Sequence, residues 1–459
     1  MPSVYIKTFG CQMNKRDSEA LAARLTSVYH YTLASSEEEA DVILLNTCSV
    51  RDGADQKAIG KMQMLIGQAR VHHRQCIFGF LGCMAQAQGE RLMTLLPGLN
   101  LVLGTHRYHL LGDYLSELVQ GKQSRIVDCG GVKECPPFFD EHLMAASAPL
   151  EEEDKDGAAH LSPTAYVNIM HGCNQHCTYC IVPETRGHEF SRPIDGIVKE
   201  CRSLAASGVK EITLLGQIVT SFGRFDIPVS ADGRSGFVQL LDAIAEIEGL
   251  ERIRFTAPHP KGYGKDLVEA YGRIPKLCES AHIPVQSGSD RILKLMRRGY
   301  TAERFLEIID QLRAVQPTIG LATDIIVGFP GETEEDFQAT VDLVRRIHFD
   351  NVFLFKYSPR QNTPAAVMPE QLPQEVKEER HARLLQVVNE LAQASYEKKV
   401  GDIVEVLVEG VSRRNVNRLQ GRSRCNKIVV FEGPAEWVGT IRKFKVTRAG
   451  QYSLYGEPV

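Results

Sequence analysis

The chain lacks any long apolar run and any export signal. Among its 459 residues there is no run of about 18 or more apolar residues, so we expect no membrane-spanning helix. The first residues, Met-Pro-Ser-Val-Tyr-Ile-Lys, lack the charged segment and apolar stretch of a secretory signal. Twelve cysteines in so long a chain do not suggest a disulfide scaffold, and clustered cysteines without export signals indicate metal ligands. These absences predict a protein of the reducing cytoplasm.

The rest of the composition is that of a folded protein with several domains. The length is enough for two or three domains, and a hydrophobic content of 43% supports sizeable cores. The net charge of -4 argues against general coating of nucleic acid, although it averages over the domains.

Three cysteines stand close together in the segment Cys173-x-x-x-Cys177-x-x-Cys180. A four-iron cubane needs a ligand on each iron, and cysteine thiolate is the usual one. Three thiolates can hold three irons and leave the fourth open to chelate the amino and carboxylate groups of S-adenosylmethionine. A structural zinc site usually has four protein ligands, and here the fourth cysteine is missing. With His171 and His176 nearby, a zinc knuckle is the alternative.

Apolar segments of strand length alternate with helical patterns over most of the chain, which is typical of α/β folds. Residues 1–125 are predicted to form a parallel-sheet domain, residues 126–160 a linker, and residues 161–393 a core with a partial (β/α)6 barrel. A helix at about 373–399 follows the last strand of this barrel. A full barrel of this kind has eight such units. The strands expected in these two domains are residues 4–9, 41–46, 75–81, 99–103, 165–170, 211–215, 252–256, 282–285, 322–327 and 352–357.

The last part of the chain, residues 394–459, changes character. Short alternating segments predict a small antiparallel β-barrel with strands at 404–410, 419–423, 427–431, 437–441 and 451–454. Its basic residues, which few acids accompany, are Arg413, Arg414, Arg418, Arg422, Arg424, Lys427, Arg442, Lys443, Lys445 and Arg448. A locally basic barrel on an acidic chain favours docking of an RNA backbone, and the alternative is a solvated charged surface.

A second set of three cysteines is scattered along the first domain. Cys11, Cys48 and Cys83 each follow one of three successive predicted strands. The carboxyl ends of parallel strands lie along one edge of a sheet, where ligands collect, so we expect these thiols to converge. The alternative for each one taken singly is an unrelated buried cysteine. Their repeated placement favours a second cubane with one iron left open.

The chain resembles the radical S-adenosylmethionine methylthiotransferases over nearly its whole length. Its compact cysteine motif has the spacing of the radical S-adenosylmethionine enzymes, with Tyr179 as the aromatic residue before the last cysteine. The segments that resemble the tRNA-modifying branch are Thr8-Phe-Gly-Cys-Gln-Met-Asn14, Asp17-Ser-Glu19 and Asn46-Thr-Cys-Ser-Val-Arg51. Other family-like segments are Thr185-Arg-Gly187, Ser191-Arg-Pro193, Pro284-Val-Gln-Ser-Gly-Ser-Asp290 and Gly328-Phe-Pro-Gly-Glu332. The branch that modifies a ribosomal protein has Pro-Lys-Asn after the first cysteine and Gly-Phe-Ile after the second, and neither is present.

The sequence departs from the family pattern at two places near the expected substrate mouth. The family usually has Tyr where Glu184 stands, and Asn-Val-Asn where Ile218-Val-Thr220 stands. Both departures bear on substrate contact and leave the reaction class unchanged.

The resemblance implies an amino-terminal cluster domain, a radical core, a carboxy-terminal TRAM domain and two [4Fe-4S] clusters. Cys11, Cys48 and Cys83 would hold one cluster, and the compact motif the other. It also implies two uses of S-adenosyl-L-methionine, of which one methylates sulfur held on the first cluster and the other is cleaved to a 5′-deoxyadenosyl radical. The radical removes the hydrogen at carbon 2 of N6-isopentenyladenosine beside the anticodon of a tRNA, and methylthio transfers to that carbon. Because that hydrogen has no acidity that a side-chain base can use, the cofactors carry the hard chemistry.

Further expectations concern binding residues and partners. Active sites of barrel enzymes lie at the carboxyl ends of the strands, and the residues found there are Gly216, Gln217, Gln286, Ser287, Ser289 and Gly328. We expect them to contact S-adenosylmethionine, although each glycine fits a simple turn equally well. The expected partners are a tRNA anticodon stem-loop and an electron donor such as flavodoxin or ferredoxin, and the protein is expected to be a monomer.

Two other functions fit parts of the pattern. One is a methylthiotransferase that acts on a threonylcarbamoyl-adenosine tRNA or on a ribosomal protein. The other is not an enzyme but an RNA-binding protein with structural metal, built on the basic carboxy-terminal barrel.

Overall fold

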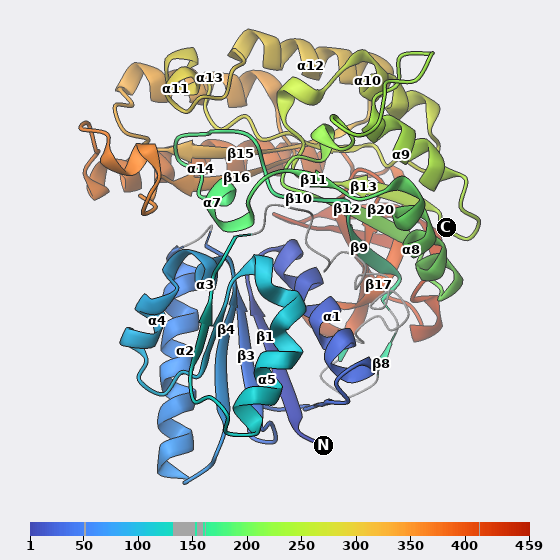
Figure 1. Cartoon of the computed structure of the whole chain (residues 1–459). Coiled ribbons are helices and arrows are strands. Elements are labelled where there is room, and N and C mark those ends of the chain that lie inside the picture. Colours follow the sequence, from blue (N-terminus) through green and yellow to red (C-terminus); the bar gives the residue numbers. More distant parts are fainter. Residues whose placement is uncertain (50–51, 132–151, 154–158, 161, 413) are drawn as a thin grey trace. The chain divides into compact units, whose positions relative to one another are not determined.

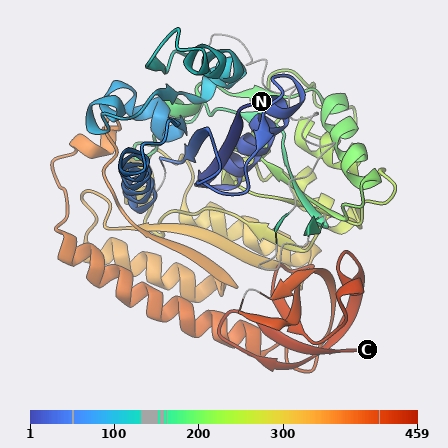
Figure 2. The ribbon, with the colours of Figure 1, turned by 90° about the horizontal axis from the view of Figure 1, so that it is seen from below.

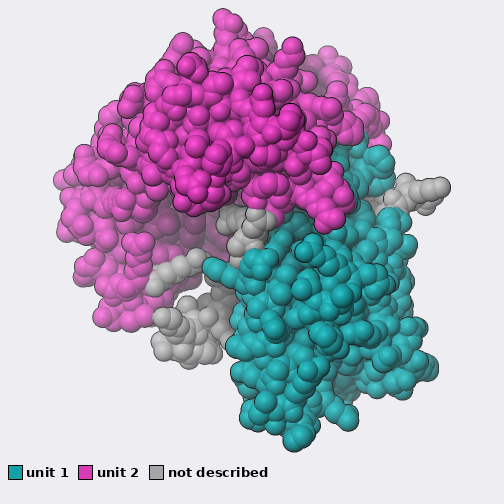
Figure 3. Space-filling view, turned by 90° about the vertical axis from the view of Figure 1, so that its left-hand side faces the viewer, with its two compact units in different colours: residues 1–150, 170–175, 181–200 teal, residues 151–169, 176–180, 201–459 magenta. Residues whose placement is uncertain are grey.

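The computed structural model describes residues 1–49, 52–131, 152–153, 159–160, 162–412 and 414–459. They form two compact units, which Figure 3 shows in different colours. Unit 1 comprises residues 1–150, 170–175 and 181–200, and unit 2 comprises residues 151–169, 176–180 and 201–459. Most of the predicted linker at 126–160, including Cys135, lies outside the described residues, as does Arg413. The boundaries of the predicted domains stay predictions.

Unit 1 is built on a six-stranded sheet with the order β2-β1-β3-β4-β5-β6, as Figure 1 shows in part. The strands are β1 Ser3–Phe9, β2 Thr32–Leu33, β3 Val42–Thr47, β4 Ile77–Gly82, β5 Leu101–Leu103 and β6 Ile126–Asp128. All neighbours pair in parallel, which confirms the predicted parallel sheet. The edge strand β6, Ile126–Asp128, pairs with β5 and takes up the first residues of the segment predicted as the linker.

Helices cover both faces of this sheet. They are α1 Gln12–Ser27, α2 Asp52–Val71, α3 Cys83–Gln88, α4 Glu90–Leu95 and α5 Leu111–Val119, with a 3-10 helix η1 at Thr105–Leu110. Successive residues of a strand point to opposite faces. Accordingly, Leu44 packs in one core with Leu21 of α1, whereas Ile43 and Leu45 pack in the other with Met62 of α2. Such a doubly covered sheet has a ligand-accessible edge at the carboxyl ends of its strands.

Unit 1 also contains short elements from later in the chain. Strands β10 Met170–His171 and β11 Phe190–Ser191 pair in an antiparallel manner, and α7 Val182–Arg186 lies between them in the sequence. Helix α8 Ile194–Ala206 runs across the boundary of the two units, since unit 1 ends at Glu200.

Unit 2 contains six parallel barrel strands in two groups, β13-β12-β9 and β14-β15-β16. Their bounds are β9 Thr164–Asn168, β12 Glu211–Leu215, β13 Arg252–Phe255, β14 Ser280–His282, β15 Gly320–Val327 and β16 Asn351–Lys356. A bridge joins Ile253 of β13 to Leu277, which lies just before β14 in the sequence. The helices are α9 Gly236–Ala245, α10 Lys265–Arg273, α11 Asp290–Leu295, α12 Ala302–Val315, α13 Glu334–Ile347 and α14 Gln374–Glu397. This arrangement confirms the predicted partial barrel.

Strand β14 ends earlier than predicted. The apolar pattern predicts this strand at 282–285, but the strand ends at His282. Pro284 lacks a backbone N–H and cannot donate to a ladder, so the regular pairing stops before it. The chain then turns toward Gln286 at the carboxyl end of the barrel.

The last region of unit 2 is a closed barrel in the order β17-β18-β19-β21-β20, seen in red in Figure 2. Its strands are β17 Ile403–Ser412, β18 Asn415–Ser423, β19 Ile428–Phe431, β20 Ile441–Ala449 and β21 Leu454–Pro458. The predicted strand at 437–441 was wrong. A 3-10 helix, η6 Ala435–Trp437, stands there instead, and Gly439 has a φ of +81°, which belongs to a turn.

Buried arginines attach this small barrel to the parallel strands. Arg252 Nη1 donates to the carbonyl of Arg422 at 2.8 Å, and Arg254 Nη2 donates to that of Ser423 at 2.8 Å. Glu211 forms an ion pair with Arg254, with 2.9 Å between Oε1 and Nε, so the buried cation is balanced. The small barrel is therefore held to β13 by buried and partly buried hydrogen bonds.

In the portion of the chain that the structure describes, every helix is too short or too polar to cross a lipid bilayer.

Candidate functional site

The three scattered cysteines follow three adjacent strands of the unit 1 sheet. Cys11 is the N-cap of α1 just after β1, Cys48 directly follows β3, and Cys83 begins α3 just after β4. In the sheet β1 and β4 flank β3, and the backbone N–H of Cys48 donates to the carbonyl of Phe9 at 3.0 Å. The parallel order therefore brings the three residues to one edge.

The thiols of this edge interact with one another. A hydrogen bond between the side chains of Cys11 and Cys48, assisted by the positive charge of Arg186, lowers the pKa of Cys11 to about 6. Cys11 also donates to Oδ1 of Asn14 at 3.2 Å. Burial raises the pKa of Cys83, and the charge of Arg186 acts against that effect. Cys11 and Cys48 thus share a hydrogen bond, and the charge of Arg186 acts on both Cys11 and Cys83.

Arg186 is the central cation of this edge. It comes from α7, and its Nε donates to Sγ of Cys83 at 3.3 Å. Its Nη2 pairs with Asp17 on α1 at 2.7 Å, and both side chains are only 3% exposed. The remaining nitrogen, Nη1, is buried and has no hydrogen-bond partner among the described residues. This nitrogen is a free donor at a site rich in sulfur.

Small and polar residues shape the same edge. Asn14 donates from Nδ2 to Oδ1 of Asn46 at 3.1 Å, and Asn46 donates to Oγ of Ser18 at 2.9 Å, so α1 is attached to the end of β3. Gly82 has a φ of +98°, and a Cβ there would lie 2.4 Å from Oδ1 of Asn46. Any larger residue before Cys83 would therefore displace this network.

Cys173 of the compact motif belongs to unit 1. It is buried, its backbone N–H donates to the carbonyl of Gly187 at 3.0 Å, and its Sγ accepts from the backbone N–H of Gln175 at 3.4 Å. Gly172 before it has a φ of +76° and sits where a Cβ would collide with the carbonyl of His188. Backbone contacts thus fix the loop, together with hydrogen bonds that the side chains of Cys173 and Asn174 accept from the backbone.

Cys177 and Cys180 belong to unit 2. The carbonyl of Cys177 accepts from the N–H of Cys180 at 3.1 Å, which turns the chain between them. Sγ of Cys177 accepts from Nη1 of Arg298 at 3.4 Å. Thr178 attaches this turn to the barrel, because its hydroxyl donates to the carbonyl of Leu295 at 2.9 Å.

The chemistry of the cysteine sets is compatible with a cubane. In the described part of the chain, no group of three or more His, Cys, Asp or Glu is arranged to hold one metal ion. A cubane makes a different demand, because each thiolate binds a different iron at a different corner. The three thiols at one sheet edge, with the unpaired Nη1 of Arg186 as a donor for an anionic centre, meet that demand.

The predicted S-adenosylmethionine contacts lie at the strand ends of unit 2. Gly216 and Gln217 follow β12, and Tyr179 is a half-buried neighbour of the core formed by Phe329 and Met296. Gln286 has a φ of +72°, and its backbone bridges Asp324 and Ile326 of β15. A left-handed conformation is strained for a residue other than glycine, and such strain gathers at functional sites.

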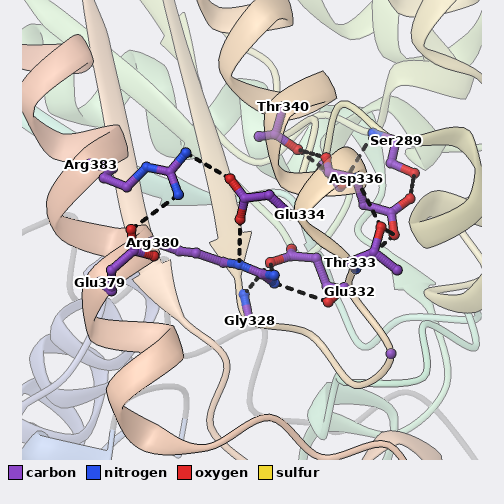
Figure 4. A network of polar contacts seen from close by, with 12 residues as sticks. Ser289, Gly328, Glu332, Thr333, Glu334, Asp336, Thr340, Glu379, Arg380 and Arg383 are labelled. Atoms are coloured by element: carbon purple, nitrogen blue, oxygen red, sulfur yellow. Dashed lines mark hydrogen bonds and ion pairs between the residues drawn. The ribbon is translucent and has the colours of Figure 1, made fainter.

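The remaining predicted contacts make bonds within the protein, as Figure 4 shows in part. Ser289 caps α11 and donates to Asp336 at 2.6 Å, and Ser287 hydrogen-bonds Thr340 at 3.3 Å. Gly328 has a φ of +72°, and a Cβ there would lie 2.5 Å from Cγ of Lys377. Its N–H donates to Glu332 at 2.9 Å. These residues therefore have structural roles, and their contact with a cofactor stays a prediction.

Two arginines that contact the cysteine sets, Arg186 and Arg298, were not predicted from the sequence. Arg186 stood in the family-like segment Thr185-Arg-Gly187 but was given no role, and nothing in the sequence pointed to Arg298. Thr220, which belongs to the second departure from the family pattern, has a structural role. Its Oγ1 accepts from the backbone N–H of His259 at 3.1 Å and so connects the loops after β12 and β13.

The partial barrel and the compact cysteine motif define a radical S-adenosylmethionine protein, and comparison with known families agrees. Residues 167–344 match the Radical SAM superfamily, residues 3–104 match the uncharacterized protein family UPF0004, and residues 397–459 match the TRAM domain. The fold is similar to that of the radical S-adenosylmethionine methyltransferase TsrM of Kitasatospora setae, with a TM-score of 0.54 and 13% identity over 80% of this chain and 77% of that chain. The cobalamin-dependent radical enzyme OxsB aligns with a TM-score of 0.52 and 14% identity over 85% of this chain and 56% of its own.

Curated relatives define the family more closely. The tRNA-2-methylthio-N(6)-dimethylallyladenosine synthase of Akkermansia muciniphila is 48% identical over 464 residues, which cover 100% of this chain and 99% of that protein. The synthase of the same name from Opitutus terrae is 46% identical over 471 residues, covering 100% and 97%. The chain belongs to this family, the MiaB-type tRNA methylthiotransferases. It is therefore an enzyme, and its radical domain implies S-adenosylmethionine and a [4Fe-4S] cluster.

Proposed function

We propose that the enzyme inserts a methylthio group at carbon 2 of N6-isopentenyladenosine beside the anticodon of a tRNA, with S-adenosyl-L-methionine and two [4Fe-4S] clusters. The observation that carries the proposal is the meeting of Cys11, Cys48 and Cys83 at one sheet edge beside Arg186. Radical chemistry alone needs one cluster. A second set of three thiols is what methylthio transfer adds, because it supplies an open iron at which sulfur can bind.

Each cysteine set would hold one cluster. Cys11, Cys48 and Cys83 would bind the first, and Cys173, Cys177 and Cys180 the second. With S-adenosylmethionine bound, a cluster supplies a one-electron cleavage that produces a radical able to take hydrogen from an unreactive carbon. The chain's own part would be to orient the clusters and to limit the access of water, which the burial of Cys48, Cys83, Cys173 and Cys177 supports, whereas Cys11 is exposed and Cys180 is partly buried.

Several residues of unit 2 would position S-adenosylmethionine. Gly216 and Gln217 would approach its methionine part, and the strained backbone of Gln286 would present a loop to its ribose. Ser287, Ser289 and Gly328 would act mainly by fixing that loop and the β15 turn, through Thr340, Asp336 and Glu332. Tyr179 would cover S-adenosylmethionine on the side that faces the cluster.

The TRAM barrel would bind the anticodon stem. A TRAM domain suggests RNA binding, and β20 presents Lys443 and Lys445 to solvent while Phe444 and Val446 fill the barrel core. Lysines on an exposed face attract phosphates. Proteins that recognise RNA usually bind the unstacked bases of its loops. An external donor such as flavodoxin or ferredoxin would supply electrons, and we expect the enzyme to act as a monomer.

Iron and sulfide analysis of the anaerobically reconstituted protein tests the two-cluster claim. Wild type should hold about eight irons per chain, because two cubanes hold four each, and Cys11→Ala should hold about four. Cys76→Ala is the matched control, since Cys76 lies in the same unit but just before β4, and its thiol contacts the carbonyl of Ala40. Iron near four in wild type, unchanged in Cys11→Ala, would refute the second cluster.

Mass spectrometry of tRNA nucleosides from a deletion strain tests the substrate. The methylthio-isopentenyl nucleoside should disappear and its isopentenyl precursor should accumulate. Loss of a methylthio-threonylcarbamoyl nucleoside, or of a modified ribosomal protein, would instead assign the enzyme to the other methylthiotransferase activities.

A further inference from the structure

A buried arginine donates a hydrogen bond to one sulfur of each cysteine set. In unit 1, Nε of Arg186 lies 3.3 Å from Sγ of Cys83, and in unit 2, Nη1 of Arg298 lies 3.4 Å from Sγ of Cys177. The two arginines are only 2% and 6% exposed. Because a guanidinium cannot be deprotonated in a protein, each set has a permanent positive charge at one sulfur.

The two charges are balanced differently. Arg186 forms a buried ion pair with Asp17 at 2.7 Å, so its charge is largely cancelled next to the sulfur. The other bonds of Arg298 go to neutral groups, the hydroxyl of Tyr300 at 3.1 Å and the carbonyl of Pro284 at 3.2 Å. No carboxylate forms an ion pair with Arg298 in the described part of the chain. The amino-terminal cysteine set therefore lies beside an ion pair with no net charge. The compact motif lies beside an arginine whose positive charge no carboxylate balances among the described residues.

Such differences act on the energy of an added electron. The reduction potential of an iron–sulfur cluster depends on the hydrogen bonds to its sulfurs and on the net charge around it. A positive charge in a water-poor site attracts the added electron more strongly than it would in water. An uncompensated arginine should thus favour reduction more than one already paired with an aspartate.

We propose that Arg298 and the Arg186–Asp17 pair are positioning residues that set the reduction potentials of the two clusters. Arg298 acts by an uncompensated charge at Cys177, and Arg186 acts at Cys83 by a charge that Asp17 reduces. The arrangement favours the cluster of the compact motif as acceptor of the electron from an external one-electron donor. The inference rests on the proposed function, because it requires a cluster at each cysteine set.

Single-cluster proteins separate the two potentials. The full chain with Cys173, Cys177 and Cys180 changed to Ala keeps the amino-terminal set, and the chain with Cys11, Cys48 and Cys83 changed to Ala keeps the other. Each should hold about four irons after anaerobic reconstitution. Failure of either protein to bind iron would overturn the proposed function, and this inference with it.

Redox titration with dithionite, followed by electron paramagnetic resonance, then measures each midpoint potential. In the first protein, Arg186→Gln should lower the potential and Asp17→Asn should raise it. Such opposite shifts from the two halves of one ion pair are not expected from a structural role. In the second protein, Arg298→Gln should lower the potential by more than Arg186→Gln does in the first. We expect at least a tenfold change in the reduction equilibrium, equal to ~59 mV for one electron.

Arg298→Lys separates charge from geometry, since lysine keeps the charge and loses the planar donor. The midpoint potential of Arg298→Lys should lie nearer to that of the protein with Arg298 unchanged than to that of Arg298→Gln. The proposal fails if Arg298→Lys matches Arg298→Gln. It also fails if Arg186→Gln and Asp17→Asn shift the potential in the same direction, or if both simply lose iron.

Discussion

Single polar side chains in this protein often hold two or three segments together at once. Asp336 is the clearest case. At the start of α13 it accepts from the backbone N–H of Thr333 at 2.9 Å, from the hydroxyl of Ser289 at 2.6 Å and from Arg291. The carboxylate therefore fixes the loop after β14, which contains predicted S-adenosylmethionine contacts, against the helix after β15.

Replacing this carboxylate should lower stability in a pH-dependent manner. Burial raises the pKa of Asp336, but hydrogen bonds from Arg291, Ser289 and Thr333 outweigh it and hold the pKa below its ordinary value. The contribution is therefore complete above the unfolded pKa of about 3.9 and is lost as pH falls toward the folded value. Asp336→Asn should cost about 2 kcal/mol of unfolding free energy at pH 7, and the gap to wild type should narrow below about pH 4.

Urea denaturation from pH 3 to pH 8 measures this gap. Asp342→Asn is the control, because Asp342 is an exposed carboxylate on the same helix whose side chain accepts from Gln338. An equal loss in both variants, or a gap that does not change with pH, would contradict the role assigned to Asp336.

At the scale of elements, α14 is the helix that crosses from the barrel to the TRAM domain. Near its start, Arg380 pairs with Glu332 of the β15 turn at 2.7 Å, and these side chains are 7% and 1% exposed (Figure 4). Near its end, Ser395 accepts from Lys427 of the small barrel at 3.0 Å. One helix thus contacts both the turn predicted to bind the cofactor and the TRAM domain.

The two arginine pairs of α14 should differ strongly in their effect on stability. Arg380→Ala leaves Glu332 buried without its cation and should cost about 3–5 kcal/mol. Arg383→Ala removes pairs with Glu334 and Glu379 in which all partners are about half exposed, and it should cost about 0–1 kcal/mol. Chemical denaturation of the two variants measures both losses. Comparable losses would show that burial does not decide the strength of these pairs.

The elements themselves were largely predictable, whereas the contacts between distant residues were not. Alternating apolar segments located the parallel strands, and Cys11, Cys48 and Cys83 were expected to converge because strand ends share an edge. Pro284 and Gly439 displaced two predicted strands, since a missing donor and a positive φ act locally on the ladder. Arg186 could not be linked to Asp17 or Cys83 from the sequence, because 169 and 103 residues separate them and no periodicity connects them.

For the whole molecule, the balance of charge matters. The chain has a net charge of -4, yet the outer face of β20 carries lysines that alternate with buried core residues. An RNA ligand would therefore be attracted to one module of a protein that is acidic overall. This local attraction depends on ionic strength in a way that can be measured.

Replacing Lys443 and Lys445 by glutamate should weaken tRNA binding and flatten its salt dependence. The slope of the logarithm of affinity against the logarithm of salt concentration should fall by about 0.7–0.9 for each phosphate that the protein no longer neutralises. Lys265→Glu is the control, because Lys265 is an 88% exposed lysine on α10, outside the small barrel. Filter binding across a salt series gives the slopes, and equal slopes in all proteins would exclude β20 from the RNA interface.

The interleaved path of the chain limits how the protein can be divided. A fragment of residues 1–125 would contain Asp17 and Cys83 but not Arg186, which enters unit 1 only through residues 181–200. Such a fragment would keep Asp17 in its interior without the arginine that forms its ion pair. Anyone who exchanges the first domain for that of a relative should transplant the 170–200 stretch with it, so that the graft carries both halves of its own ion pair.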